Sequence, residues 1–297
     1  MRDGFHPHRS LKLDQISPFP VVALLQCKAQ RGLILQSIEL MKNNATHYHL
    51  AILFFFILSS CTQRSKITDD FVRQQDRDVA GFFSDSLTDF SVDVYYEASS
   101  PPYTGALESI PTNTAWDITL LSFKELFKTH TKRTVTVPHE LVGMKSFPDR
   151  MVTSWDEKQL IQLAASMSRA PAIGQQIASV FFLRGTYMGQ STVLGIHFSG
   201  YKAAFIFKDN LTHFYTTATF LQNIEQATVV HELGHVIGLV NNGLPMKSPH
   251  EDSAHPHHST DPKDVMYWDL VAAVTQIDQM VLFGPQSLSD GQGFHTP

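Results

Sequence analysis

Residues 229–240 constrain the fold of this chain more than any other segment, because they combine an apolar helical stripe with two histidines four residues apart. On an α-helix, side chains four residues apart lie on the same face, and apolar side chains at alternating steps of four and three form a stripe. His231 and His235 fall outside that stripe. We therefore expect a helix that packs one face into the core and presents two imidazoles to a cleft. The stripe consists of Val229, Leu233, Val236 and Val240.

The residue that follows the first histidine adds a chemical role to this helix. Glu232 completes the pattern His-Glu-x-x-His, and Gly238 comes three residues after His235. Two imidazoles so placed can ligate one Zn²⁺, while the glutamate can act as general base toward a water on the metal. Gly238 permits the left-handed backbone with which a chain can end a helix and turn back. The alternative interpretation is a pair of structural histidines on a helix surface.

Six of the 15 histidines lie between positions 231 and 258, and the block around the last of them carries a family resemblance. The order His-Glu-x-x-His-x-x-Gly with a distant methionine resembles the metzincin branch of zinc metalloproteases. That branch normally has its third ligand three residues after the glycine, where this chain has Asn241. The chain is more similar to archaemetzincin-like proteases, whose pattern continues as histidine, cysteine, four residues, cysteine, any residue and methionine. Here His258 and Met266 keep the histidine, the spacing and the methionine, whereas Ser259 and Asp264 occupy the cysteine positions.

An insertion of residues 242–257 separates this block from the helix, and the sequence is also similar to that of bacterial membrane-anchored metalloproteases. The resemblance implies that His258 is the third zinc ligand, beside His231 and His235. Without an imidazole at position 241, the other histidines of the loop remain candidates for that place. These alternative third ligands are, in order of preference, His255, His257 and His250.

Three further roles are expected in the same region. His250 and Asp252 could bind a second metal ion or orient a ligating histidine, and solvated loop residues are the other interpretation. Met266 is expected in the methionine turn that underlies the zinc histidines of metzincins. Tyr267 could donate a hydrogen bond to an oxyanion, or Tyr267 and Trp268 could line the cleft.

The remaining chain alternates between strand-like and helix-like patterns, which predicts a single α+β domain of the zincin type over residues 91–297. Its expected architecture is a mixed twisted sheet packed with helices, one of which carries the two histidines. Residues 193–198 and 203–207 are close enough for a hairpin, and they precede that helix. An edge strand at this place binds the substrate in metzincins, so a peptide could add to it by main-chain hydrogen bonds. Other expected strands are 90–96, 133–138 and 177–183, and other expected helices are 116–128, 156–167 and 268–283.

The first sixty residues predict export to the cell envelope. Nine consecutive apolar residues, Leu50–Leu58, are too few to cross a bilayer and match the apolar core of a secretory signal peptide. Two serines and Cys61 follow, and the group resembles the bacterial lipobox, whose cysteine is lipidated. Acyl chains on Cys61 would anchor the protein to a membrane surface. Thr62 after the cysteine resembles a signal for outer-membrane sorting, and an ordinary thiol at Cys61 is the alternative.

This signal predicts a division of the N-terminal part. Counting back from the lipobox, Met41 opens a segment of normal signal length with a basic start, so we interpret residues 1–40 as an upstream extension that does not belong to the protein. Residues 41–60 are then a lipoprotein signal peptide, and the polar residues 61–90 are a tether. A real N-terminal extension over residues 1–40 is the alternative.

Composition limits the classes that remain. Of the 297 residues 43% are hydrophobic, which is ordinary for a folded chain, and two cysteines cannot make a disulfide scaffold. A net charge of −5 offers no general footprint for nucleic acid. The sequence therefore predicts a zinc-dependent endopeptidase that is anchored to the bacterial cell envelope and acts on peptides or proteins. The alternatives are a non-catalytic lipoprotein that uses the zincin fold as a binding module, and a zinc hydrolase of cell-wall peptides.

Overall fold

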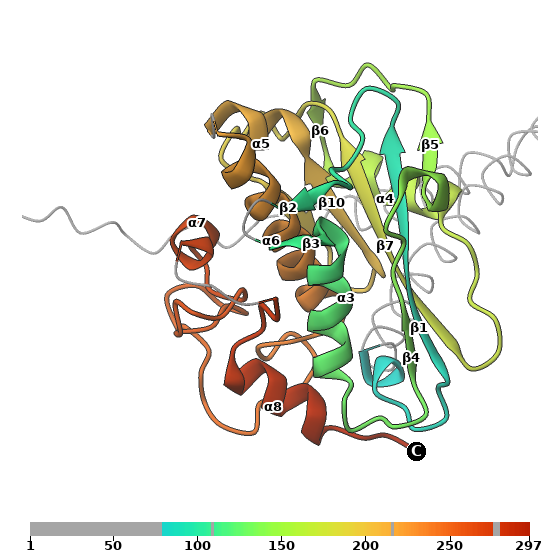
Figure 1. The fold of residues 1–297 in the computed structure, drawn as a ribbon, viewed down its shortest axis with the longest axis vertical. Coiled ribbons are helices and arrows are strands. Elements are labelled where there is room, and N and C mark those ends of the chain that lie inside the picture. The colour runs from blue at the N-terminus through green and yellow to red at the C-terminus, as the bar shows by residue number, and fades with distance from the viewer. Residues whose placement is uncertain (1–78, 108–109, 215–216, 276–279) are drawn as a thin grey trace, which may run out of the picture. The chain divides into compact units, whose positions relative to one another are not determined.

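A mixed six-stranded sheet lies at the centre of the residues that the computed structural model describes, which are 79–107, 110–214, 217–275 and 280–297 (Figure 1). Its strands are β1 (Asp89–Glu97), β4 (Thr134–Thr136), β5 (Lys145–Phe147), β7 (Gln175–Leu183), β9 (Gly195–His197) and β10 (Ala203–Phe207). Their order is β4-β1-β7-β10-β9, and β5 also pairs with β1. The pairings are parallel except that between β9 and β10, so β9 ends the order as an antiparallel edge strand.

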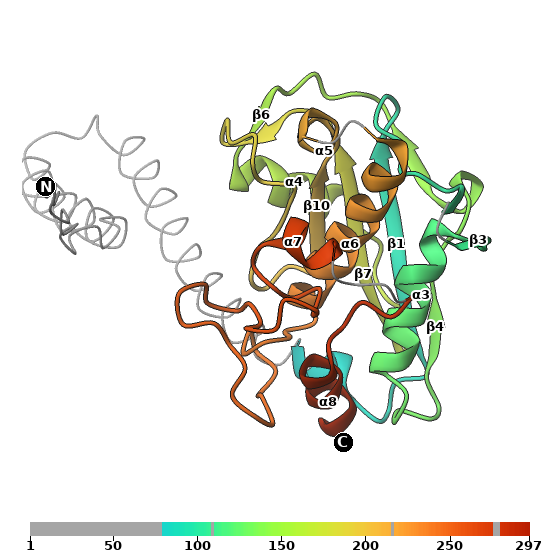
Figure 2. The ribbon, with the colours of Figure 1, turned by 60° about the vertical axis from the view of Figure 1, so that its left-hand side comes forward.

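Helices cover both faces of this sheet (Figure 2). α3 (Ala115–Leu126) and α6 (Ala218–Val236) pack on one face, and α4 (Glu157–Met167) packs on the other. Successive side chains of a strand point to opposite faces. Val180 and Phe182 of β7 accordingly join the core under α3 and α6, whereas Phe181 and Leu183 join the core under α4. Apolar residues on both faces are typical of a mostly parallel, buried sheet.

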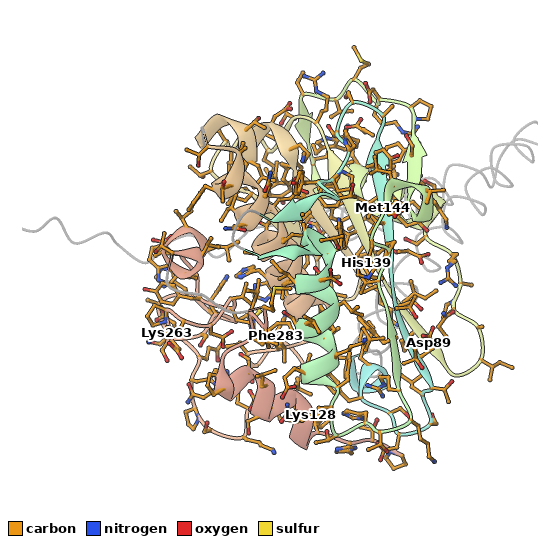
Figure 3. The ribbon with its side chains drawn as sticks, in the orientation of Figure 1. Asp89, Lys128, His139, Met144, Lys263 and Phe283 are labelled. Carbon is orange, nitrogen blue, oxygen red and sulfur yellow. The ribbon has the colours of Figure 1, made fainter. Side chains whose placement is uncertain are left out.

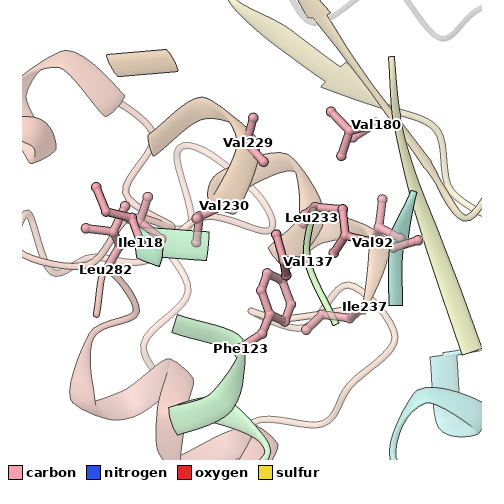
Figure 4. Packing of buried hydrophobic residues seen from close by; sticks show 14 of the residues in the cluster. Val92, Ile118, Phe123, Val137, Val180, Val229, Val230, Leu233, Ile237 and Leu282 are labelled. Atoms are coloured by element: carbon pink, nitrogen blue, oxygen red, sulfur yellow. The ribbon is translucent and has the colours of Figure 1, made fainter. Parts of the chain in front are cut away.

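The helix that carries the two histidines is wedged into the larger core. Figure 4 shows Val229 and Leu233 of α6 between Phe123 of α3 and the side chains of Val92 and Val180 in the sheet. All five side chains are buried. Because packing fixes α6 from two sides, the side chains on its remaining face are held in one position relative to the sheet edge.

The residues after α6 are mostly loop, and aromatic packing ties their last part to the core. Phe283, labelled in Figure 3, lies two residues before α8, and its ring packs edge-on against that of Phe123 with centroids 5.4 Å apart. The smaller elements are β2 (Ala106–Leu107), β3 (Ile110–Thr114), η3 (Leu141–Gly143), β6 (Ser154–Trp155), β8 (Thr186–Tyr187), α5 (Lys208–Phe214), α7 (Leu270–Val274) and α8 (Pro285–Gly293).

The structure confirms the predicted α+β class, with a mixed sheet and helices in one compact unit of described residues. The hairpin of β9 and β10 and the helix capped by Asp156 lie where the sequence predicts them. The predicted helix over 268–283 is wrong in extent, because the structure has the short α7 and a separate α8. Val240 of the apolar stripe lies beyond the end of α6, although it is buried.

The predicted tether extends too far toward the fold. Phe82 and Phe83 are buried and pack in the main core, and Phe82 contacts Phe90 with ring centroids 5.9 Å apart. Residues 79–90 are therefore part of the folded domain, because their aromatic side chains gain free energy by burial. The upstream extension 1–40, the signal peptide 41–60 and Cys61 lie outside the described residues. Among the described residues, no helix combines the length and apolar character needed to cross a membrane.

Candidate metal centre and active site

The two histidines of α6 lie in its last turns, where every residue from Ile224 to Val236 is buried. The Nε2 atoms of His231 and His235 are 3.1 Å apart. Two nitrogens bound at about 2.0–2.1 Å to one tetrahedral zinc ion stand roughly 3.3 Å apart. The helix therefore places this pair at the separation that a shared zinc ion requires.

His258 brings a third imidazole to the same point from the loop after α6. Its ring centroid lies 5.2 Å from that of His231 and 4.9 Å from that of His235. One ligand atom from each of the three side chains lies within 4.8 Å of the others. The structure therefore brings together the three histidines that the sequence resemblance implies as a ligand set.

Hydrogen bonds orient two of these imidazoles. His231 donates from Nδ1 to the carbonyl oxygen of Val265 at 2.6 Å, and His258 donates from Nδ1 to that of Pro256 at 3.0 Å. A carbonyl oxygen only accepts hydrogen bonds, so Nδ1 carries the proton in both rings and Nε2 keeps its lone pair. Such partners fix the tautomer and the direction of metal-binding histidines.

The electrostatic surroundings favour neutral imidazoles at this point. Burial lowers the pKa of His231 to about 3 and that of His235 well below its ordinary value. It also lowers the pKa of His258, which is half-buried. Metal ions bind neutral imidazole, so the donor set suits a divalent metal such as zinc.

Glu232 lies on the side of α6 that faces β9. Burial raises the pKa of its carboxyl to about 8, and a dication held by the neighbouring histidines would favour the ionised form. A Cβ atom at Gly195 of β9 would stand 2.7 Å from Cγ of Glu232 and 2.8 Å from Cγ2 of Thr228. The edge strand can therefore pass directly over Glu232 only because residue 195 has no side chain.

His197 is a site residue that the sequence does not reveal. Its ring stacks on that of His235 with centroids 4.8 Å apart, and its Nε2 accepts a hydrogen bond from the side-chain amide of Asn242 at 3.0 Å. The proton of the neutral ring is therefore on Nδ1, which lies 3.9 Å from Oε2 of Glu232. Burial lowers the pKa of His197 to about 4, so the ring is neutral. Side chains alternate between the two faces of a strand, so His197 and Gly195 lie on one face of β9. This alternation is the only feature of the sequence that points to His197 as a site residue.

Met266 lies directly beneath the histidine helix. A Cβ atom at Gly234 would stand 2.4 Å from Sδ of Met266, so the glycine within the histidine motif admits the methionine. Met266 is fully buried, and its neighbour Val265 accepts the hydrogen bond of His231. Met266 and Val265 thus pack against the part of α6 that carries the two histidines.

The two positions where the archaemetzincin-like pattern has cysteines hold this turn by hydrogen bonds. Asp264 is buried, and its carboxylate accepts from the backbone N–H of Met266 at 3.0 Å and from the hydroxyl of Ser287 at 2.6 Å. Ser259 donates its backbone N–H to the carbonyl oxygen of Met266 at 2.8 Å. Burial raises the pKa of Asp264.

The chain turns sharply after α6 to reach this block. Gly238 has a φ of 88° and donates its N–H to the carbonyl oxygen of His235 at 3.0 Å, as expected for a glycine that ends the helix. Asn241, at the usual metzincin ligand position, instead donates its amide to Glu251 at 2.8 Å. Asn242 donates to the carbonyl oxygen of His235 at 3.0 Å. The two asparagines therefore support the loop and the histidine helix.

The alternative third ligands have other partners. His255 contacts Asp252 at 2.7 Å and stacks on the exposed Trp268 with centroids 4.1 Å apart. His257 faces Glu251 at 3.5 Å. These side chains are therefore engaged in the loop, and neither belongs to the group formed with His231 and His235.

His250 and Asp252, which the sequence offers as a second metal site or as support for a ligating histidine, have different partners in the structure. The His250 side chain is fully buried and its Nε2 faces Asp290 at 3.5 Å, whereas the carboxylate of Asp252 binds His255. The cause is packing, because the loop turns His250 inward beneath it while Asp252 stays near the surface. Tyr267 follows Met266 in the chain, and the centroid of its ring lies 5.9 Å from that of Trp268.

The chain resembles known proteins only weakly. The sequence matches no protein-family model and no curated protein. The chain is similar to a zinc-dependent peptidase from Methanocorpusculum labreanum, at 13% identity and a TM-score of 0.39, over 67% of this chain and 99% of that one. It is also similar to archaemetzincin from Methanopyrus kandleri, at 13% identity and a TM-score of 0.42, over 70% of this chain and 95% of that one. Such values do not establish a family, so the function proposed below depends on the residues of the site.

Proposed function

We propose that the protein is a zinc-dependent peptidase. The observation that carries this proposal is the convergence of His231, His235 and His258 beside the buried carboxylate of Glu232. Three neutral imidazoles are the donors that a catalytic zinc site uses, and in His231 and His258 the proton on Nδ1 leaves Nε2 free. A carboxylate next to them is the group that such a site needs for moving protons.

Each step of the proposed hydrolysis has a group of this chain assigned to it. A bound zinc ion would acidify a water molecule and polarise the scissile carbonyl. Glu232 accepts the proton of the attacking water and passes it to the leaving amine. Nδ1 of His197 lies 3.9 Å from Oε2 of Glu232, and Gly195 leaves room for the carboxylate. His197 is thus a positioning residue, since it acts through Glu232.

The edge strand β9 is the proposed binding place of the substrate backbone. It is the last strand in the sheet order and its residues stay partly exposed. An extended peptide can add to such an edge by main-chain hydrogen bonds. A cavity of about 190 Å³ lined by His197, His235 and Asn242 adjoins this strand and can accept a side chain.

Replacing Glu232 by glutamine tests the proposal. Glu232→Gln keeps the shape of the side chain but cannot take up a proton, so zinc content should be unchanged while kcat falls at least about 10²-fold. Cleavage of fluorogenic peptides with and without a chelator is the assay, together with metal analysis of the same samples. Glu157→Gln, at an exposed position of α4, is the matched control and should keep full activity.

The same assay decides between the proposed activity and the alternatives. Full activity of Glu232→Gln would refute the assigned base. Zinc binding without hydrolysis of any peptide by the natural protein would favour a binding module. Cleavage restricted to cell-wall peptides would assign the second alternative.

For localisation, we propose lipid anchoring to the bacterial envelope through Cys61. Its support is the apolar run Leu50–Leu58 directly before the lipobox-like residues. In a bacterial expression host the natural protein should fractionate with membranes, and Cys61→Ala should move it to the soluble fraction. A natural protein found only in the soluble fraction would refute this proposal.

A further inference from the structure

A second, separate cluster of possible metal ligands lies where three distant segments meet. Asp85 precedes β1, His130 follows α3, and His295 follows α8. One ligand atom of each side chain lies within 4.8 Å of the others. None of the three belongs to the candidate active site, and no sequence motif joins them.

The geometry of this cluster leaves one buried nitrogen without a partner. Oδ1 of Asp85 lies 2.7 Å from Nδ1 of His295 and 3.5 Å from Nδ1 of His130. Nε2 of His130 donates to the carbonyl oxygen of Gly291 at 3.4 Å, so Nδ1 of the neutral ring presents a lone pair. The His130 side chain is 2% exposed, and Nδ1 has no hydrogen-bond partner among the described residues.

A hydrogen bond between Asp85 and His295 alone does not account for this arrangement. It would satisfy those two side chains, but it would leave the lone pair of His130 buried and unpaired, which is costly for a polar atom. The imidazole rings of His130 and His295 lie with centroids 4.2 Å apart, so their nitrogens border the same space. An ion in that space would satisfy all three groups.

We propose that Asp85, His130 and His295 form a second zinc site with a structural role. The three side chains line a surface cavity of about 280 Å³, which has room for an ion and its remaining water ligands. Two imidazoles and one carboxylate are donors that zinc accepts readily. The proposal does not depend on the peptidase activity, because it uses none of the active-site residues.

Positive charge around the cavity narrows the choice of ion. Lys132 and Arg133 also line it, and the Arg133 guanidinium is held by the carbonyl oxygens of Phe82 and Ser84 at 2.6 and 2.7 Å. A single carboxylate among these cations is a poor site for Ca²⁺ or Mg²⁺, which need several oxygen ligands. Zinc gains most of its binding from the imidazoles instead.

The expected consequence of binding is attachment of the segment after α8 to the first residues of the fold. Ser84 and Thr296 form a β-bridge, and the N–H of Asp85 donates to the carbonyl oxygen of Thr296 at 2.8 Å. The ion would add a further link to these hydrogen bonds, because its ligands come from distant segments that must come together before it binds.

Zinc counting on the full chain tests the proposal. After equilibration with Zn²⁺ and gel filtration, the natural protein should retain two equivalents, and His295→Ala or Asp85→Asn should retain one. Both changed side chains are partly exposed, so both variants should fold, which circular dichroism would check. The double variant His231→Ala/His235→Ala should still retain one equivalent. His139→Ala removes a histidine outside both clusters and is the matched control with two equivalents.

A stability measurement gives a second readout that needs no activity. In the His231→Ala/His235→Ala variant, saturating Zn²⁺ should raise Tm by about 5 °C, and the further change His295→Ala should abolish this shift. Calcium should not replace zinc. The proposal is overturned if the double variant retains no zinc, if His295→Ala leaves the zinc count unchanged, or if inorganic phosphate instead of zinc raises Tm. Loss of the peptidase activity alone would leave these results unchanged.

Discussion

Gly195→Ala should disable the proposed active site by one methyl group without touching a zinc ligand. The new Cβ atom would stand 2.7 Å from Cγ and 3.0 Å from Oε1 of Glu232. Carbon atoms in contact prefer separations of at least about 3.5 Å, so the Glu232 side chain must move by roughly 0.8 Å. A displacement of about 1 Å in an active site can cost on the order of 10²-fold in rate.

We therefore expect kcat/KM to fall about 10- to 100-fold, which corresponds to about 1.4–2.7 kcal/mol in activation free energy. Zinc content should stay at the natural level, because carbonyl oxygens outside β9 hold the imidazoles of His231 and His258. The assay is single-substrate kinetics on a fluorogenic peptide, with zinc measured on the same preparation. Gly81→Ala is a suitable control, since its new Cβ atom would meet only the flexible end of Gln176 at 3.3 Å.

Two results would refute the reasoning for Gly195→Ala. Unchanged kcat/KM would mean that the methyl group added at residue 195 does not displace the Glu232 carboxylate. A parallel loss of zinc and activity would mean that the methyl group disturbs the whole site and not the carboxylate alone.

Three further predictions concern the region around this site. Gly234→Ala places a methyl group 2.4 Å from Sδ of Met266. The overpacking should cost about 1–3 kcal/mol, which exceeds the gain of about 1 kcal/mol in helix propensity. The free energy of unfolding measured with urea should therefore be lower than that of the natural protein. His258→Ala should weaken zinc binding at least about 10²-fold in a competition titration, while the neighbouring His257→Ala should not. Burial raises the pKa of Asp264 above 3.8, so the native state keeps a proton that the unfolded chain has released. The contribution of this carboxyl to the free energy of unfolding therefore falls as the pH rises through its native pKa. In chelator-treated protein, Asp264→Asn should remove this pH dependence of the free energy of unfolding. Parallel pH profiles of the natural protein and the variant would contradict this prediction.

Features that depend on neighbouring residues could be predicted from the sequence. The positions of His231 and His235 follow from helical geometry, and the start of α4 follows from Asp156, whose side chain accepts a hydrogen bond from the N–H of Gln159 at 2.8 Å. The class of the fold follows from the alternation of strand and helix patterns. These features are local, so a short window of sequence contains the information that specifies them.

Features that depend on contacts between distant segments could not be predicted in this way. His197 faces Glu232 only because β9 pairs with β10 in one particular register and crosses α6 at Gly195. His250 turns inward because Asp290 of α8 lies beneath the loop. Nothing in the sequence near either histidine specifies the partner that decides its orientation.

The place of β1 in the sheet has a consequence for how the chain is made. β1 pairs in parallel with β7, and Asp89 faces Gln175, so this strand stays without its main partner until the whole stretch between them has left the ribosome. Contacts of such long range form slowly, and an apolar strand that waits for them can aggregate. β1 is therefore open to wrong pairing for as long as the segment up to β7 is being synthesised. The candidate metal centre can form only after the whole sheet has been synthesised, since its third histidine, His258, follows every strand of the sheet in the sequence.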